Sequence, residues 1–260
     1  MGYETIEITP MTPRIGAEVS GIDLTESLGN QQFQELHDAL MEHSVLFFRN
    51  QNVDVEQHKN FGRLFGDLHI HPGSPPPPGH PEILIVHADK DSKHIAGENW
   101  HSDVTCDAEP PMGSILHLWE VPESGGDTLF ASMEAAYDDL SERMKIYLDG
   151  LNATHSGEQI YRGRYNNQDH DDTNMTYPRN VHPVVRTHPV TGRKSIFVNK
   201  TFTTHINDIP KAESDSVLAL LYNHCTKPDY QVRFKWQPHS IAFWDNRCVQ
   251  HLALWDYYPQ

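Results

Sequence analysis

The sequence predicts a mainly β fold with flanking helices (α+β), built as a β-sandwich or jelly roll. Three observations lead to this prediction. Apolar runs of strand length recur along the chain, glycine and proline separate them, and only a few segments have helical spacing. Many short strands with few helices are typical of sandwiches and rolls. A chain of 260 residues can bury a sizeable core, so we expect residues 1–260 to form one domain.

The N-terminal part of the chain predicts short strands and two helices around one buried strand. Residues 6–24 read as strands and turns, because glycines interrupt the apolar residues. Residues 30–42 have apolar side chains at helical spacing, whereas the apolar run 45–48 has the length of a buried strand. Asp54 is a suitable cap for a second helix, and Gly66 ends that helix.

Strands predominate in the rest of the chain, with two further helical stretches. Residues 132–151 predict a helix that is broken near Ser141, and residues 213–225 predict a helix with one apolar stripe. Consecutive prolines at 75–78 predict a stiff, extended surface loop that leads into a strand at 83–86, and the alternative is that this loop forms a rim over the functional site. The other predicted strands lie at 114–121, 127–131, 182–186, 195–199, 230–236 and 240–244.

Residues 158–180 differ from their surroundings in composition. Gln, Asn, Asp, Arg and Tyr crowd this segment, and aliphatic side chains are almost absent from it. Such a composition predicts a long loop. The loop is either a solvated insertion or a lid over the functional site, and the sequence favours neither interpretation.

The charge of the chain excludes several classes of partner. The net charge is −16 with histidine neutral, which argues against nucleic acid and against an anionic membrane surface, because both require a basic face. A small anionic substrate is still compatible, since a few cations or imidazoles can hold it. The first ten residues have neither a basic flank nor an apolar run, so we expect no signal peptide. No stretch has the length of a membrane-spanning helix.

The three cysteines, Cys106, Cys225 and Cys248, are an odd number and form no C-x-x-C pair. We therefore expect reduced, buried thiols and a cytoplasmic location, rather than a disulfide framework or a catalytic thiol. We also expect a homo-oligomer, either a dimer or a tetramer.

Two separate stretches, 99–103 and 244–251, contain the residues of a metal site. If the first stretch forms a strand, His101 and Asp103 point to the same side, and His251 can complete the set from a distant strand. Two imidazoles and one carboxylate suit a non-haem Fe(II) oxygenase, because they cover one face of an octahedral ion and leave three positions open. The same ligands also suit a zinc hydrolase. A His-x-Asp pair by itself is weak evidence in a chain with 18 histidines.

Around these stretches the sequence resembles the TauD/TfdA family of Fe(II)- and 2-oxoglutarate-dependent dioxygenases, and within it the taurine dioxygenases. The resemblance implies a double-stranded β-helix in which His101, Asp103 and His251 hold Fe(II). It also implies that 2-oxoglutarate and O2 are consumed, that a small anionic substrate is hydroxylated, and that succinate and CO2 are released. Asp103 favours hydroxylation over halogenation, since related halogenases lack this carboxylate. The resemblance runs from residue 8 to residue 260 and rests on the stretches 15–21, 65–72, 125–128, 182–189 and 197–199.

The resemblance assigns further residues to the co-substrate and the substrate. Thr128 matches a threonine that holds the distal carboxylate of 2-oxoglutarate together with an arginine. We expect that arginine, and the strand that carries it, to lie after Gln260. His71 matches a residue that contacts the substrate anion, whereas Val104 and Phe202 match residues that line the substrate pocket.

Two positions depart from the taurine-specific members of the family. Ser74 replaces a tyrosine and Gly97 replaces an asparagine, and both of those side chains contact taurine. We therefore expect an alkyl sulfonate or alkyl sulfate other than taurine as the substrate. An aryloxyalkanoate substrate and a non-catalytic jelly-roll metal binder are the alternatives that the sequence leaves open.

Overall fold

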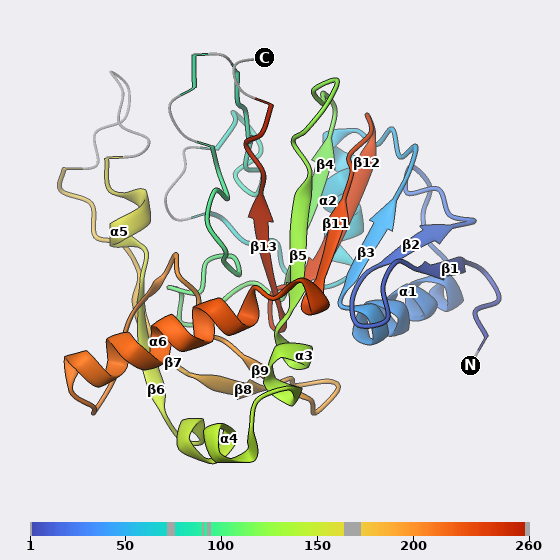
Figure 1. Cartoon of the computed structure of the whole chain (residues 1–260). Coiled ribbons are helices and arrows are strands. Elements are labelled where there is room, and N and C mark those ends of the chain that lie inside the picture. The colour runs from blue at the N-terminus through green and yellow to red at the C-terminus, as the bar shows by residue number, and fades with distance from the viewer. Residues whose placement is uncertain (1, 72–75, 90, 93–94, 164–172, 258–260) are drawn as a thin grey trace.

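The computed structural model describes residues 2–71, 76–89, 91–92, 95–163 and 173–257 (Figure 1). Within them the fold is mainly β-sheet with a few helices. A five-stranded sheet has the order β1 (Glu7–Pro10), β2 (Ala17–Ser20), β3 (Val45–Phe48), β12 (Ser240–Asp245) and β4 (Gly113–Leu118). A three-stranded sheet has the order β11 (Gln231–Phe234), β5 (Thr128–Ser132) and β13 (Val249–Ala253).

Two smaller sheets complete the β structure. One has the order β10 (Thr203–Ile206), β6 (Asn152–Ser156) and β7 (Arg179–Pro183), and the other pairs β8 (Val185–Thr187) with β9 (Lys194–Ile196). Figure 1 shows β5 and β13 between the five-stranded sheet on the right and β6 and β7 on the left.

Strand alternation explains how the two larger sheets pack. In β3, Val45 and Phe47 contact one apolar cluster, whereas Leu46 and Phe48 contact another. The first cluster also contains Phe130 of β5, whose ring lies 5.4 Å from that of Phe47, and further residues of β11 and β13. The two sheets therefore enclose this cluster between them, and β3 reads as a continuous apolar run because both of its faces are buried.

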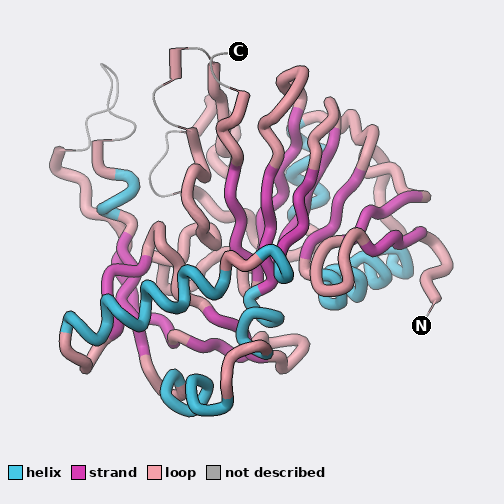
Figure 2. The backbone as a smooth tube through the Cα atoms, viewed as in Figure 1, coloured by secondary structure: helices cyan, strands magenta, loops and turns pink. Residues whose placement is uncertain are grey.

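The helices cover the remaining apolar faces. α1 (Asn30–His43) and α2 (Val55–Arg63) pack on the other side of the five-stranded sheet. α3 (Met133–Asp138), α4 (Glu142–Leu148) and α6 (Lys211–Cys225) lie below β5 and β13 in Figure 2 and pack against the smaller sheets. The short helices α5 (Glu158–Tyr161) and η1 (Pro228–Tyr230) complete the helical structure of the described residues.

Local side-chain chemistry accounts for the helix boundaries. Asp54 accepts the backbone N–H of Gln57, and the Gln57 side chain in turn accepts the N–H of Asp54, which together form a capping box. Ser141 caps α4 by accepting the N–H of Met144, which confirms the predicted break between α3 and α4. No helix in the described part of the chain is long and apolar enough to span a membrane.

Most of the predicted elements are confirmed, but the strand predicted at 83–86 is wrong. These residues pair with no strand in the described part of the chain, and the side chains of Ile85 and Val86 are 66% and 50% exposed. Residues 158–180 are also not wholly loop, since α5 opens the segment and β7 begins at Arg179.

Candidate active site

The structure brings His101, Asp103 and His251 together, although they are far apart in the sequence. Asp103 Oδ1 lies 3.4 Å from His101 Nε2 and 3.8 Å from His251 Nε2. One ligand atom from each residue lies within 4.8 Å of the other two. Ligands with bonds of about 2.1 Å on adjacent corners of an octahedron lie about 3 Å apart, so a small closure of the three groups would seat an ion.

His251 owes its position to strand β13. It lies opposite Phe130 of β5, on the inward face of the sheet, and its ring centroid is 6.0 Å from that of Phe130 and 4.6 Å from that of Trp244. These aromatic rings keep the imidazole from turning toward solvent. Burial and the neighbouring His101 together lower the pKa of His251 to about 3, against a smaller opposing effect of Asp103, so the ring is neutral near pH 7, as a metal ligand must be.

The predicted strand at residues 101–103 is wrong, because His101 makes only an isolated β-bridge to His251 and residues 103–106 form a turn. Hydrogen bonds that involve side chains replace the missing backbone pairing of a strand. Ser102 Oγ donates to the carbonyl of Val249 at 2.6 Å, and the N–H of Asp103 donates to Asn246 Oδ1 at 3.2 Å. Asp103 thus enters the site through a turn, not through strand alternation.

The protonation of the ligands favours a metal ion. His101 Nδ1 lies 2.7 Å from the carbonyl of Asn99, which can only accept, so Nδ1 carries the hydrogen and Nε2 presents its lone pair to Asp103. Burial raises the pKa of Asp103, but His251, His101 and the hydroxyl of Ser114 outweigh it, and the pKa lies below its ordinary value. One carboxylate anion and two imidazoles are a ligand set that fits a divalent cation.

Thr128 lies on the same sheet face as the metal site. It faces Ala253 of β13, two residues from the Phe130–His251 pair, which is about 7 Å along the strand. Thr128 is buried, and its hydroxyl oxygen accepts the indole N–H of Trp236 at 2.9 Å. That bond leaves the hydroxyl hydrogen of Thr128 for another acceptor.

Val104 and Phe202 belong to one buried cluster together with Tyr161 and Tyr177. The ring centroid of Phe202 lies 6.4 Å from that of His101 and 6.0 Å from that of Tyr161. Tyr161 and Tyr177 come from segment 158–180, so the described ends of that segment pack beside the metal site. Residues 164–172 lie outside the described residues, and the interpretation of the whole segment as a lid stays a prediction.

His71 lies at the edge of this cluster, with its ring centroid 5.0 Å from that of Tyr161. Burial lowers the pKa of His71, while Asp103 partly offsets that effect. The neighbouring His69 has a different environment, because its Nε2 lies 2.7 Å from Asp107 Oδ2. This pair joins the chain at His69 to the turn that follows Asp103.

Gly97 also borders the site. A Cβ atom at this position would lie 3.5 Å from His101 Cε1 and 3.5 Å from the Cβ of Ala253, and the backbone of Gly97 has a φ of +83°. The asparagine of taurine-specific relatives would be strained in this conformation. Ser74, the second departure from those relatives, lies outside the described residues.

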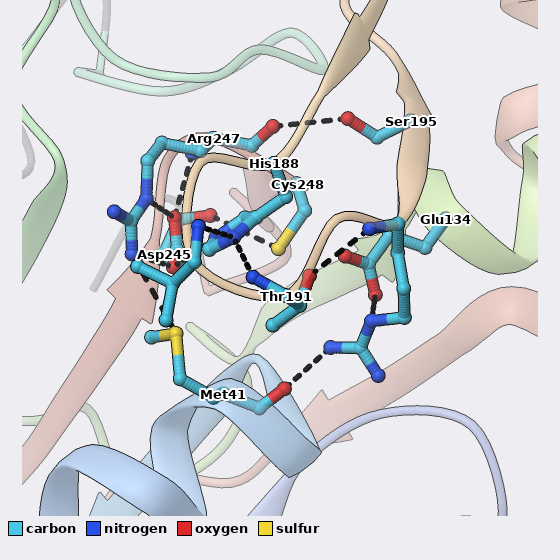
Figure 3. Close-up of polar contacts among 10 residues, drawn as sticks. Met41, Glu134, His188, Thr191, Ser195, Asp245, Arg247 and Cys248 are labelled. Atoms are coloured by element: carbon cyan, nitrogen blue, oxygen red, sulfur yellow. Dashed lines mark hydrogen bonds and ion pairs between the residues drawn. The ribbon is translucent and has the colours of Figure 1, made fainter.

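A second group, His188, Asp245 and Cys248, also has the composition of a metal site (Figure 3). However, the polar atoms of its histidine and aspartate already bond to partners within the protein. His188 Nδ1 accepts the backbone N–H groups of Val190 and Thr191, so Nε2 carries the hydrogen and donates to Asp245 Oδ2 at 3.0 Å.

The other partners of this second group leave no site for an ion. Arg247 donates to both carboxylate oxygens of Asp245, at 2.8 and 2.6 Å. Burial raises the pKa of the Cys248 thiol well above its usual value. We interpret the group as a structural clamp on the turn between β12 and β13, and Arg247 is part of it through its Nε and Nη2 donors.

Sequence reasoning missed four residues of the site, and they divide into two kinds. Tyr161 and Tyr177 are aromatic residues in an otherwise polar segment, and this contrast could have indicated that they are buried. Ser114 and Asn246 contact Asp103 through hydrogen bonds, and neither residue carries a signal in the sequence.

Two imidazoles and one carboxylate converge at the end of a β-sheet core, which is the ligand composition of proteins with a 2-His-1-carboxylate triad. The chain belongs to the TauD/TfdA family, since the family model "Taurine catabolism dioxygenase TauD, TfdA family" matches residues 7–260.

Similar proteins agree with this assignment. An alkylsulfatase of Acinetobacter baylyi is 37% identical over 99% of this chain and 82% of its own length. An alpha-ketoglutarate-dependent sulfonate dioxygenase of Saccharomyces cerevisiae is 36% identical over 97% of this chain. The chain spans 64% and 63% of the length of two yeast relatives. The crystal structure of a taurine dioxygenase from Burkholderia xenovorans superposes with a TM-score of 0.83, at 33% identity, over 99% of this chain and 87% of that one.

Proposed function

We propose that the protein is an Fe(II)- and 2-oxoglutarate-dependent dioxygenase that hydroxylates a small anionic organic molecule of the alkyl sulfonate or alkyl sulfate type. The proposal is based on one observation. His101 Nε2, Asp103 Oδ1 and His251 Nε2 converge, with the imidazole of His251 neutral and the carboxylate ionised. When bound, iron with 2-oxoglutarate and O2 supplies the oxidising chemistry, and succinate and CO2 are the co-products.

The other residues bind and orient the reactants. Thr128 directs a hydroxyl hydrogen along the inner sheet face, where it can meet a carboxylate of 2-oxoglutarate. His71, a neutral imidazole beside the cluster, can donate one hydrogen bond to the substrate anion. Val104 and Phe202 present apolar surface next to His101, which suits an alkyl group.

The substrate assignment depends on the apolar surface and on two relatives. The cluster around Phe202 contains the aromatic rings of Tyr161 and Tyr177, which favours a longer apolar chain than that of taurine. The relatives named as an alkylsulfatase and as a sulfonate dioxygenase agree with an anion that contains sulfur. The alternative substrate class is aryloxyalkanoates, since a 2,4-dichlorophenoxyacetate dioxygenase of Cupriavidus pinatubonensis is 33% identical.

We further propose that the two larger sheets form the double-stranded β-helix of this enzyme class. Support comes from the shared core between the sheets and from the position of His251 at its edge. In such a roll the metal ligands lie at the mouth, where substrate and O2 can enter.

The experiment is a substrate panel with Fe(II), ascorbate and 2-oxoglutarate, in which succinate is measured. Hexyl sulfate and hexanesulfonate are expected to yield succinate together with sulfate or sulfite, and taurine is expected to be a poor substrate. His101→Ala, Asp103→Ala and His251→Ala should each abolish succinate formation and Fe(II) binding. His37→Ala is the control, because His37 lies on α1 and pairs only with Asp38 among the ion pairs of the described residues.

Three outcomes would contradict the proposal. Release of sulfate with zinc and without consumption of 2-oxoglutarate would indicate a hydrolase. Metal binding without turnover of any panel member would indicate a metal binder. Efficient, saturable turnover of taurine would show that the interpretation of the pocket is wrong.

A further inference from the structure

The two oxygens of Asp103 have different surroundings. Oδ1 faces the two imidazoles, at 3.4 Å from His101 Nε2 and 3.8 Å from His251 Nε2. Oδ2 instead accepts the hydroxyl hydrogen of Ser114 at 2.6 Å. One oxygen is thus directed at the ion position, and the other is already occupied by a protein donor.

Ser114 is the last member of a chain of hydrogen bonds that runs in one direction. Trp244 Nε1 donates to Asn246 Oδ1 at 3.0 Å, and Asn246 Nδ2 donates to Ser114 Oγ at 2.8 Å. An indole N–H can only donate, so the carbonyl oxygen of Asn246 must face Trp244 and its amide must face Ser114. The hydroxyl hydrogen of Ser114 therefore has Asp103 Oδ2 as its acceptor. Asn246 Oδ1 also accepts the backbone N–H of Asp103 at 3.2 Å, which holds the turn itself.

The residues of this series of hydrogen bonds lie on rigid elements of the fold. Ser114 of β4 lies directly opposite Trp244 of β12 in the five-stranded sheet. Trp244 and Asn246 are 4% and 2% exposed, so solvent does not compete for their bonds. Asn246 follows β12 and precedes β13, which carries His251. The same turn therefore positions the carboxylate ligand and leads to the distal histidine.

We propose that Ser114 and Asn246 are positioning residues that hold Asp103 as a ligand through one oxygen. With Oδ2 bound to Ser114, the carboxylate can take one coordination position and leaves three for the co-substrate and O2. Without this bond the carboxylate can rotate and offer both oxygens to the ion. The inference rests on the proposed function, because it takes Asp103 as a metal ligand.

The test measures metal binding without turnover. Mn(II) and Co(II) are titrated into the metal-free protein by calorimetry, and the absorption bands of the Co(II) form report the coordination of the ion. Ser114→Ala should weaken metal binding by about 10- to 100-fold, the usual effect of losing a partner of a metal ligand, and should change the Co(II) bands. Ser114→Thr keeps the hydroxyl and should restore both the affinity and the spectrum.

Two further variants separate positioning from loss of structure. Asn246→Asp replaces the amide donor with an oxygen, so the Ser114 hydroxyl can turn away from Asp103, and the Co(II) bands should change as in Ser114→Ala. Ser214→Ala is the matched control, since Ser214 is a fully buried serine of α6 whose hydroxyl accepts the N–H of Ile206 at 2.8 Å. It should lower stability and leave metal binding unchanged.

The outcomes are distinct. Unchanged affinity and an unchanged Co(II) spectrum in Ser114→Ala would overturn the inference while the proposed function stands. Equal metal binding by the wild-type protein and Asp103→Ala would overturn the proposed function itself, and the inference with it.

Discussion

At the scale of single residues, the direction of one N–H group separates the metal site from a structural clamp. His101 and His188 each lie beside an aspartate. His101 gives its hydrogen to a backbone carbonyl and turns a lone pair toward Asp103, whereas His188 gives its hydrogen to Asp245. Composition alone would rank the two groups equally. The hydrogen-bond partners of the second ring nitrogen decide which group can accept a cation.

The residue scale also gives a prediction for His71. His71→Ala removes a donor to the substrate anion, and hydrogen bonds to charged groups contribute roughly 1.5–3 kcal/mol. The KM for the substrate should therefore rise by about 10- to 100-fold, while the KM for 2-oxoglutarate changes little. Steady-state kinetics with each reactant varied in turn measure both constants. His71→Gln keeps an N–H donor, so it should raise the KM for the substrate less than His71→Ala does. An equal rise of the KM values for the substrate and for 2-oxoglutarate would contradict this role.

Residue types predicted which three side chains converge in the candidate metal site, but they could not predict the groups that orient them. His101, Asp103 and His251 are detectable because few side chains bind metals. Ser114 is one serine at the start of a strand, and its role depends on the register of β4 against β12. That register is a property of the folded sheet, so no local pattern contains it.

At the scale of elements, apolar patterning predicted most strands and failed where strands are polar. β6 and β10 have the sequences NATHS and TTHI, which lack an apolar run. They are nevertheless buried, because their polar groups bond to one another and to Thr105, which lies 2.9 Å from His155 Nδ1. The reverse error occurred at residues 83–86, where an apolar run has no strand partner in the described residues. A strand requires a neighbour, which composition does not reveal.

An element-scale prediction concerns the start of α2. Asp54→Ala removes the carboxylate that accepts the N–H of Gln57 and leaves only the backbone bond from residue 54 to the Gln57 side chain, so the free energy of unfolding should fall by about 1 kcal/mol. Urea denaturation monitored by circular dichroism measures the change. Asp38→Ala is the control, because Asp38 lies within α1, where its exposed carboxylate accepts from Gln34 and pairs with His37 but caps no helix. A loss as large in Asp38→Ala would show that the cap has no special contribution.

At the scale of the whole molecule, several histidines are held neutral by burial. Burial and the neighbouring His182 lower the pKa of His155 to about 3, and burial with His58 and His239 lowers that of His117 to about 4. In the unfolded chain these imidazoles take up protons near pH 6.5. Folding therefore excludes protons over the range between the two pKa values, and the stability of the metal-free protein depends on pH.

The sign of this dependence follows from proton linkage. Below pH 6.5 the unfolded state binds a proton at residue 155 that the folded state does not bind until about pH 3, so stability falls as pH decreases. Between pH 7.5 and 5.5, His155 should account for a loss of about 1.4 kcal/mol. Urea denaturation of the metal-free protein at the two pH values measures the loss. His155→Gln has no titrating ring, so its own loss should be smaller by about that amount, although the variant is less stable at both pH values. An identical loss in the wild-type protein and the variant would show that His155 is protonated in the folded state.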